Sequence, residues 1–241
     1  MNVDVFIPCF IDQFYPETAV NVISVLEKAG CNVNYNPDQT CCGQPAFNSG
    51  YWDETRTLAV KFINDFNGAN FIVSPSASCT GFIKNYYGKL FETDKQRLNE
   101  SNQLSKRIFE FSDFLVNHLN FVDFDSVFNH KVTFHDSCAG LREYGIKNEP
   151  RILLQNVKGL ELVEMENTDT CCGFGGTFAA KFHSISTAMT EQKVENALKT
   201  GADYIVSTEA SCLMNIESYI RKKKLPIKTI HLADVLMQEE N

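Results

Sequence analysis

Long apolar stretches are missing from this sequence. No run reaches the ~18 consecutive apolar residues of a membrane-spanning helix, so no integral membrane segment is expected. The first residues, Met1 to Val5, lack the basic start and apolar core of a secretory signal, which favours a cytoplasmic protein. Positive charge is also scarce, because 22 lysines and arginines stand against 30 aspartates and glutamates. The resulting net charge of −8 disfavours nucleic acid as a partner.

Several catalytic and cofactor-binding motifs are absent as well. The chain has neither Gly-x-Ser-x-Gly nor His-Glu-x-x-His, and it has no flavin or nicotinamide signature. The stretch from Gly173 to Gly176 superficially suggests a dinucleotide loop, but Phe178 stands where a third glycine or alanine is needed. Close Cys-x2–4-Cys pairs, typical of zinc sites, and the cysteine run of bacterial ferredoxins are missing too. These absences disfavour nucleotide binding and leave the catalytic residues unknown.

Cysteine, by contrast, is abundant and regularly placed. Eight of the nine cysteines form two copies of one pattern: a single cysteine, a Cys-Cys-Gly sequence and another single cysteine. The ninth, Cys31, has no counterpart and is expected to be a small buried hydrophobe. In a reducing compartment this number of cysteines favours metal ligation or redox chemistry over disulfides. The two copies are Cys9, Cys41-Cys42-Gly43 and Cys79, then Cys138, Cys171-Cys172-Gly173 and Cys212.

Short β-rich runs alternate with helical patterns, and the alternation repeats in the two halves of the chain. It predicts an α/β protein of two pseudo-repeated, Rossmann-like βαβ halves with mostly parallel sheets. A polar stretch at 121–130 suggests one domain over 1–125 and a second over 126–241. Residues 92–105 are expected to form a solvated helix or an insertion. The predicted strands are 3–7, 33–35, 71–74, 132–135, 161–164 and 204–207; the predicted helices are 16–28, 53–66, 150–157 and 186–199, with two more just after Cys79 and Cys212.

This arrangement predicts one thiol site in each half. Ligands in parallel sheets gather beyond the carboxyl ends of the strands. Four of the cysteines follow predicted strands, and the two Cys-Cys-Gly turns can meet them at the same edge. The glycine after each pair allows a tight turn, and the backbone N–H groups of 172–176 can hydrogen-bond thiolates or sulfides. Four thiolates suit either an iron–sulfur cluster or zinc, and the spacing leaves both open.

The doubled cysteine pattern resembles the cysteine-rich CCG domain, which occurs in iron–sulfur subunits of heterodisulfide reductase, glycolate oxidase and anaerobic glycerol-3-phosphate dehydrogenase. The greatest similarity is to the lactate-utilisation members of the family. It covers essentially the whole chain. The residues that carry it are His135-Asp136-Ser137-Cys138-Ala139-Gly140-Leu141-Arg142, Pro150 to Leu154 and Cys171 to Phe178, with Pro8-Cys9, Cys41 to Pro45 and Ser78-Cys79 in the first half.

The resemblance implies an iron–sulfur electron-transfer subunit of a complex that oxidises L-lactate to pyruvate. The implied partners are a protein with ferredoxin-type clusters and a third subunit. The implied cofactors are one or two [4Fe–4S] clusters, bound by Cys9, Cys41, Cys42 and Cys79 and by Cys138, Cys171, Cys172 and Cys212. Ser76 and Glu209 replace the additional cysteine that the heterodisulfide reductase subunit carries three residues before the last one. An ordinary cubane [4Fe–4S] cluster is therefore expected in place of a non-cubane cluster.

Three further side chains are candidates for the chemistry around these sites. Arg142 and Arg151 can bind a substrate carboxylate or balance the negative charge of a cluster. Alternatively, each can form an ordinary ion pair without a role in the chemistry. His135 can tune a cluster or relay a proton, or it can be a buried histidine with ordinary hydrogen bonds. Two other functions stay open: a zinc-bound assembly scaffold without redox activity, and an iron–sulfur subunit for another 2-hydroxy acid such as glycolate.

Overall fold

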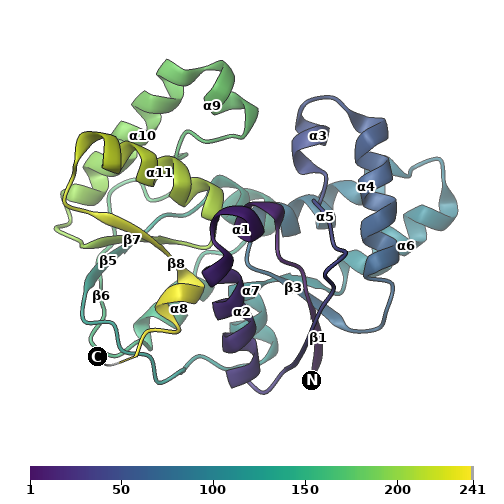
Figure 1. Ribbon diagram of the computed structural model, residues 1–241, viewed down its shortest axis with the longest axis horizontal. Coiled ribbons are helices and arrows are strands. Elements are labelled where there is room, and N and C mark those ends of the chain that lie inside the picture. The colour runs from purple at the N-terminus through teal and green to yellow at the C-terminus, as the bar shows by residue number, and fades with distance from the viewer. Residues whose placement is uncertain (240–241) are drawn as a thin grey trace.

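The computed structural model describes residues 1–239 and contains two four-stranded, entirely parallel sheets (Figure 1). The sheet orders are β2-β1-β3-β4 and β6-β5-β7-β8, so the second half repeats the topology of the first. This confirms the predicted α/β class and its two related halves. The strands are β1 (Asn2–Val5), β2 (Asn32–Tyr35), β3 (Phe71–Ser74), β4 (Ile108–Glu110), β5 (Lys131–Phe134), β6 (Glu161–Leu162), β7 (Tyr204–Ser207) and β8 (Lys228–His231).

The central strands of each sheet are short apolar runs buried on both faces. Val3 and Val5 of β1, and Ile72 and Val73 of β3, have no exposed surface. Continuous burial of this kind is typical of parallel sheets with helices on both sides. The predicted strand at 161–164 is shorter than expected, because only Glu161 and Leu162 pair with β5.

Helices connect the strands, and most lie within a few residues of their predicted positions. The helices that were expected after Cys79 and Cys212 begin two residues before these cysteines, at Ala77 and Ala210. Both cysteines therefore lie in a first helical turn. The longer helices are α2 (Pro16–Lys28), α4 (Trp52–Asp65), α5 (Ala77–Leu90), α6 (Lys95–Ser105), α10 (His183–Leu198) and α11 (Ala210–Lys223); the shorter ones are α1 (Cys9–Phe14), α3 (Gln44–Asn48), α7 (Phe111–Asp113), α8 (Glu149–Gln155), α9 (Thr177–Lys181) and α12 (Leu232–Val235).

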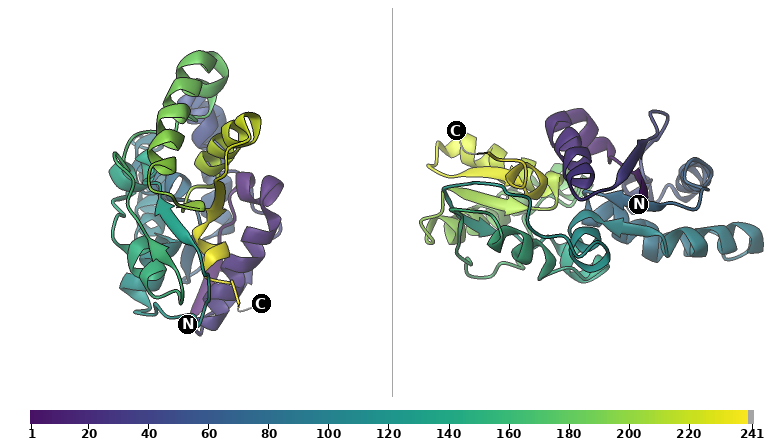
Figure 2. Two further views of the ribbon diagram at one scale, coloured as in Figure 1. Left: turned by 90° about the vertical axis from the view of Figure 1, so that its left-hand side faces the viewer. Right: turned by 90° about the horizontal axis from the view of Figure 1, so that it is seen from below.

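The charged stretch at 92–105 folds mainly into α6, which protrudes at the far end of the first half (Figure 2). It is not wholly solvated, because Ser101 and Leu104 are buried on the side that packs against α5. Two further segments are π-helical: η1 (Phe114–His118) and η2 (Ala139–Tyr144).

The two halves lie side by side and share contacts from several elements (Figures 1 and 2). Helix α5 packs on η2, and α2 packs on α12. Asp234 of α12 accepts hydrogen bonds from Thr18 Oγ1 at 2.8 Å and from Asn21 Nδ2 at 2.9 Å. Residues 119–130 connect the halves, and the division between 125 and 126 stays a prediction. Among the described residues, no helix has the length and apolar character needed to cross a membrane.

Candidate metal centres

The first group of four cysteines gathers where β1, β2 and β3 end. Cys9 is the first residue of α1, and Cys79 lies in the first turn of α5. Cys41 and Cys42 stand in the turn that precedes α3. Neighbouring thiols hydrogen-bond in the order Cys9, Cys41, Cys42, Cys79, and the Sγ atoms of Cys42 and Cys79 are 3.4 Å apart. The structure thus brings together all four cysteines of the first copy.

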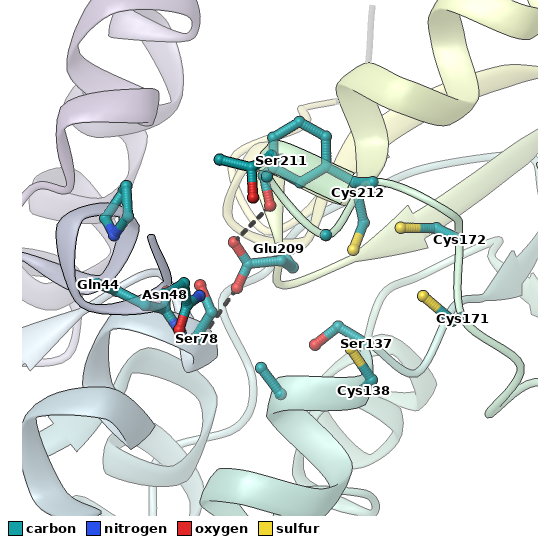
Figure 3. Close-up of a pocket in the computed structure, with 16 residues that line it drawn as sticks. Gln44, Asn48, Ser78, Ser137, Cys138, Cys171, Cys172, Glu209, Ser211 and Cys212 are labelled. Carbon is teal, nitrogen blue, oxygen red and sulfur yellow. Dashed lines mark hydrogen bonds between the residues drawn. The ribbon is translucent and has the colours of Figure 1, made fainter. Parts of the chain in front are cut away.

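The second group repeats this arrangement. Cys138 directly precedes η2, Cys212 lies in the first turn of α11, and Cys171 and Cys172 form the turn before α9. Hydrogen bonds again link the thiols in the order Cys138, Cys171, Cys172, Cys212. Figure 3 shows the four side chains turned toward one another on one side of a cavity.

One thiol in each group is stabilised as a thiolate. The pKa of Cys41 is lowered because its sulfur accepts hydrogen bonds from Cys42 and Cys9. The pKa of Cys171 is lowered because its sulfur accepts hydrogen bonds from Cys138 and Cys172. In both turns the backbone N–H of the following glycine donates to that same sulfur at 3.4 Å. Thiolates are the form of cysteine that binds metals, so each turn presents an anionic ligand.

The glycines of the two turns have backbone conformations that other residues rarely adopt. Gly43 has a φ of +90° and Gly173 a φ of +88°. A β-carbon at Gly173 would lie 2.5 Å from the Ser186 carbonyl oxygen. Glycine therefore lets the two neighbouring thiols face one site while the turn packs tightly against α10.

The two cysteine groups lie beside neighbouring cavities, and the residues that line both cavities form a wall between the groups. The cavity beside the second group has a volume of about 240 Å³, and the cavity beside the first about 90 Å³. Gln44, Ser78, Phe174 and Glu209 line both of them. The wall places the two cysteine groups next to each other across the contact between the halves.

Glu209 forms the centre of this wall and was not assigned a role from the sequence. Its buried carboxylate accepts from Ser76 Oγ at 3.1 Å. It also accepts from Ser78 N and from Ser211 Oγ, each at 3.0 Å (Figure 3). Ser76 is its counterpart in the first half, so the two positions that lack the additional cysteine contact each other. A contact between residues so far apart in the chain leaves no local sequence signal.

His135 lies beside the second group and is completely buried. Its pKa is lowered to about 3, mainly by burial and then by the charge of Lys193. The backbone of Thr168 lies close enough to raise this pKa. Its distance and angle to the ring do not meet the criteria for a hydrogen bond, so neither ring nitrogen has a partner among the described residues. His135 is thus buried, as one of the two alternatives expected, but its ring lacks the ordinary hydrogen bonds of that alternative in the described structure.

Lys193 is a second group that sequence reasoning missed. The side chain is buried on α10, and its ammonium donates to the carbonyls of Asn167 at 2.8 Å and Thr168 at 2.9 Å. Burial lowers its pKa to about 8, while the charges of Cys172 and Asp136 raise it. The sequence did carry a signal for this residue, because Lys193 falls on the buried face of a predicted helix, and buried lysines are almost always paired. It places a cation near the second group of thiols.

The two arginines have different environments. Arg151 binds Asp136 through two nitrogens at 2.9 Å each and also pairs with Glu164, so it is held in ion pairs. Arg142 is exposed and donates to the Asp169 carbonyl at 3.3 Å. It lines a further cavity of about 340 Å³ that also reaches Cys138. Cys31 is buried in the core, as expected for the unmatched cysteine.

The donor set fits a thiophilic metal in both halves. Each group offers four cysteine sulfurs, one of them favoured as a thiolate, at the carboxyl edge of a sheet. In the second group, His135, Cys172 and Cys212 have ligand atoms within 4.8 Å of one another. Soft thiolates select zinc and iron–sulfur clusters over hard cations such as magnesium or calcium.

Comparison with known proteins gives a consistent assignment. The family described as "Cysteine-rich domain" (CCG) matches residues 3–84 and again 132–217. Lactate utilization protein A 1 of Bacillus mycoides is 40% identical over 239 residues, covering 99% of this chain and 98% of that protein. Lactate utilization protein A of Halalkalibacterium halodurans is 41% identical over 240 residues, covering 100% of this chain and 98% of that protein.

A solved structure supports the fold. The crystal structure of a hypothetical protein from Helicobacter pylori superposes with a TM-score of 0.63 at 12% identity; it covers 100% of this chain, which spans 49% of that one. This likeness concerns the fold alone. The repeated cysteine groups and the full-length relatives carry the rest of the assignment. The chain belongs to the cysteine-rich CCG domain family, together with the relatives named lactate utilization protein A.

Proposed function

We propose that this protein is an iron–sulfur electron-transfer subunit of a cytoplasmic complex that oxidises L-lactate to pyruvate. The observation that carries the proposal is the pair of four-cysteine groups on either side of a shared wall. The relatives named lactate utilization protein A direct the proposal to lactate. In it, Cys9, Cys41, Cys42 and Cys79 hold one cluster, and Cys138, Cys171, Cys172 and Cys212 hold the other.

A bound cluster would supply one-electron transfer, and the protein residues would hold it and adjust its surroundings. The Gly43 and Gly173 amides donate to Cys41 and Cys171, which offsets thiolate charge. Lys193 adds a buried positive charge beside the second group. The Glu209 wall separates two centres in one chain, an arrangement that suits passage of electrons between partners. Those partners would be a ferredoxin-type iron–sulfur protein and a third subunit.

Zinc is the main alternative, because four thiolates bind zinc as well as iron. The test is the iron and zinc content of protein purified without oxygen, together with its visible spectrum. The proposal expects about eight irons per chain and absorbance near ~400 nm that bleaches with dithionite. Stoichiometric zinc and a colourless protein would replace electron transfer with a structural scaffold.

The substrate is tested separately with the assembled complex. Adding L-lactate to the complex should bleach the visible band of this subunit, and adding glycolate should bleach it far more slowly. Faster bleaching with glycolate would keep the electron-transfer role and move the substrate to another 2-hydroxy acid. This chain alone should not respond to lactate, because it carries no flavin or nicotinamide signature.

A further inference from the structure

His135 is buried without a hydrogen-bond partner, which is costly for a polar side chain. It is the first residue after β5, and its amide donates to the Val206 carbonyl at 2.8 Å. Neither Nδ1 nor Nε2 has a partner among residues 1–239. A buried, unpaired imidazole in a native protein calls for a ligand.

The ring faces two of the cysteines proposed as ligands. One ring nitrogen of His135 and the sulfurs of Cys172 and Cys212 all lie within 4.8 Å of one another. A metal ion bound to cysteine sulfur at ~2.3 Å and to histidine nitrogen at ~2.0 Å brings such atoms within this range. The ring nitrogen is therefore placed to join the two cysteines in holding one metal centre.

The nearby buried lysine does not compete with a metal for this ring. The Lys193 ammonium is already held by the Asn167 and Thr168 carbonyls, so it does not occupy the ring.

The first half has a phenylalanine where the second has this histidine. Phe6 is the first residue after β1, and its amide donates to the Val73 carbonyl at 2.9 Å, as His135 does to Val206. Phe6 is completely buried and packs edge-on against Phe62, with ring centroids 4.8 Å apart. No histidine lines the described cavity of the first group. The repeat thus places an apolar ring in one half and a metal-binding ring in the other.

We propose that His135 is a nitrogen ligand of the second metal centre, alongside Cys172 and Cys212, so that the two centres of this chain have different ligand sets. This inference rests on the metal-binding part of the proposed function. The second centre then has five possible protein ligands for the four irons of a cube, and the first has four. Replacing a thiolate by a neutral imidazole makes the centre less negative and raises its reduction potential.

The test labels histidine with ¹⁵N in the anaerobically prepared, full-length protein. Pulsed electron paramagnetic resonance of the reduced clusters should detect one strongly coupled histidine nitrogen. The coupling should disappear in His135→Phe, which copies the first half, and remain in His183→Phe, an exposed histidine at the start of α10. In His135→Phe one of the two reduction potentials should fall, and the other should stay unchanged.

The wild-type spectrum decides the question even if His135→Phe does not fold. Two clusters without a coupled histidine nitrogen would overturn the inference and leave the proposed function standing. Zinc in place of iron would overturn the proposed function alone, and absence of any bound metal from the wild type would overturn this inference with it. The cysteine variants give a matched second test. Cys9→Ser should lose the iron of its centre, whereas Cys138→Ser should retain most of it, because His135 supplies the fourth ligand.

Discussion

At the scale of single residues, the two Cys-Cys-Gly turns are unequal despite their identical sequences. A β-carbon at Gly43 would lie 3.3 Å from a Thr55 methyl carbon, which has room to adjust. A β-carbon at Gly173 would lie 2.5 Å from the backbone oxygen of Ser186, which does not. The second turn therefore tolerates a side chain in place of its glycine less well than the first turn does.

We expect Gly173→Ala to destabilise the protein by about 2–3 kcal/mol, from left-handed strain together with the clash. It should also lower the metal content of the second centre. Gly50→Ala is the matched control, because Gly50 has a φ of +87° but nothing within 4 Å of the added carbon. Urea unfolding and metal analysis measure both effects. Equal losses in the two variants would contradict a specific clash at Gly173.

Glu110 is a buried acid whose ionisation should set part of the pH dependence of stability. Burial raises the pKa of Glu110 to about 8, and the hydrogen bonds that Ser112 and Asp113 donate to one carboxylate oxygen lower it only in part. The other oxygen has no partner in the described structure. The folded state therefore holds a proton that the unfolded chain releases above about pH 4.5. The free energy of unfolding should fall by up to about 1.4 kcal/mol for each pH unit from there to about pH 8.

Glu110→Gln should remove this dependence and make the protein more stable than the wild type near pH 8. Thermal unfolding at several pH values measures the difference, and Glu92→Gln, at an exposed position, is the control. Parallel curves for wild type and Glu110→Gln would show that Glu110 is ionised at low pH in the folded protein.

At the scale of elements, the starts of α5 and α11 explain why the cysteines converge. The sequence predicted helices after Cys79 and Cys212, but both helices begin two residues earlier; of the two, α5 has a side-chain cap and α11 has none. Ser76 accepts the Cys79 amide at 3.4 Å, so α5 begins at Ala77. The N-termini of these two helices then lie beside the two cysteine groups. Hydrophobic pattern and composition locate helix starts only to within a residue or two.

Glu209 links these two helix starts, and its removal should weaken the contact between the halves. Glu209→Ala leaves the Ser78 amide and the Ser76 hydroxyl without their acceptor, at a cost of about 2–4 kcal/mol for these charge-assisted bonds. Ser211→Ala removes a single bond to the same carboxylate and should cost about 1 kcal/mol. Urea midpoints compare the two variants. A Glu209→Ala protein as stable as Ser211→Ala would show that solvent replaces the lost contacts.

At the scale of the whole molecule, the sequence predicted the repeat but not how its copies meet. The spacing of the cysteines and the apolar runs at 71–74 and 204–207 indicated two equivalent halves, because both features are local and periodic. The Ser76–Glu209 contact and the isolation of His135 depend on the packing of distant segments. The same holds for the difference between Phe6 and His135, which matters only once the two halves are superposed.

The halves share one buried apolar cluster, although each half also contains a cluster of its own. A single buried cluster contains Val5 and Phe114 from the first half together with Phe134, Leu153 and Leu236 from the second. Hydrogen bonds cross the same contact, including Tyr144 Oη to Asp113 at 2.6 Å and His231 Nε2 to the Pro75 carbonyl at 3.2 Å. Each half therefore buries part of its apolar surface only against the other.

Fragments covering 1–125 and 126–241 should consequently not fold as independent units. Separation exposes the shared apolar cluster, and buried apolar area supplies most of the free energy that offsets chain entropy. Each fragment alone should lack a cooperative thermal transition and should bind a hydrophobic dye, whereas mixing the two should restore the near-ultraviolet circular dichroism of the intact chain. A cooperative transition in fragment 1–125 alone would show that the repeat consists of two autonomous domains. The intact protein should unfold in one transition, because loss of either half removes the surface against which the other is packed.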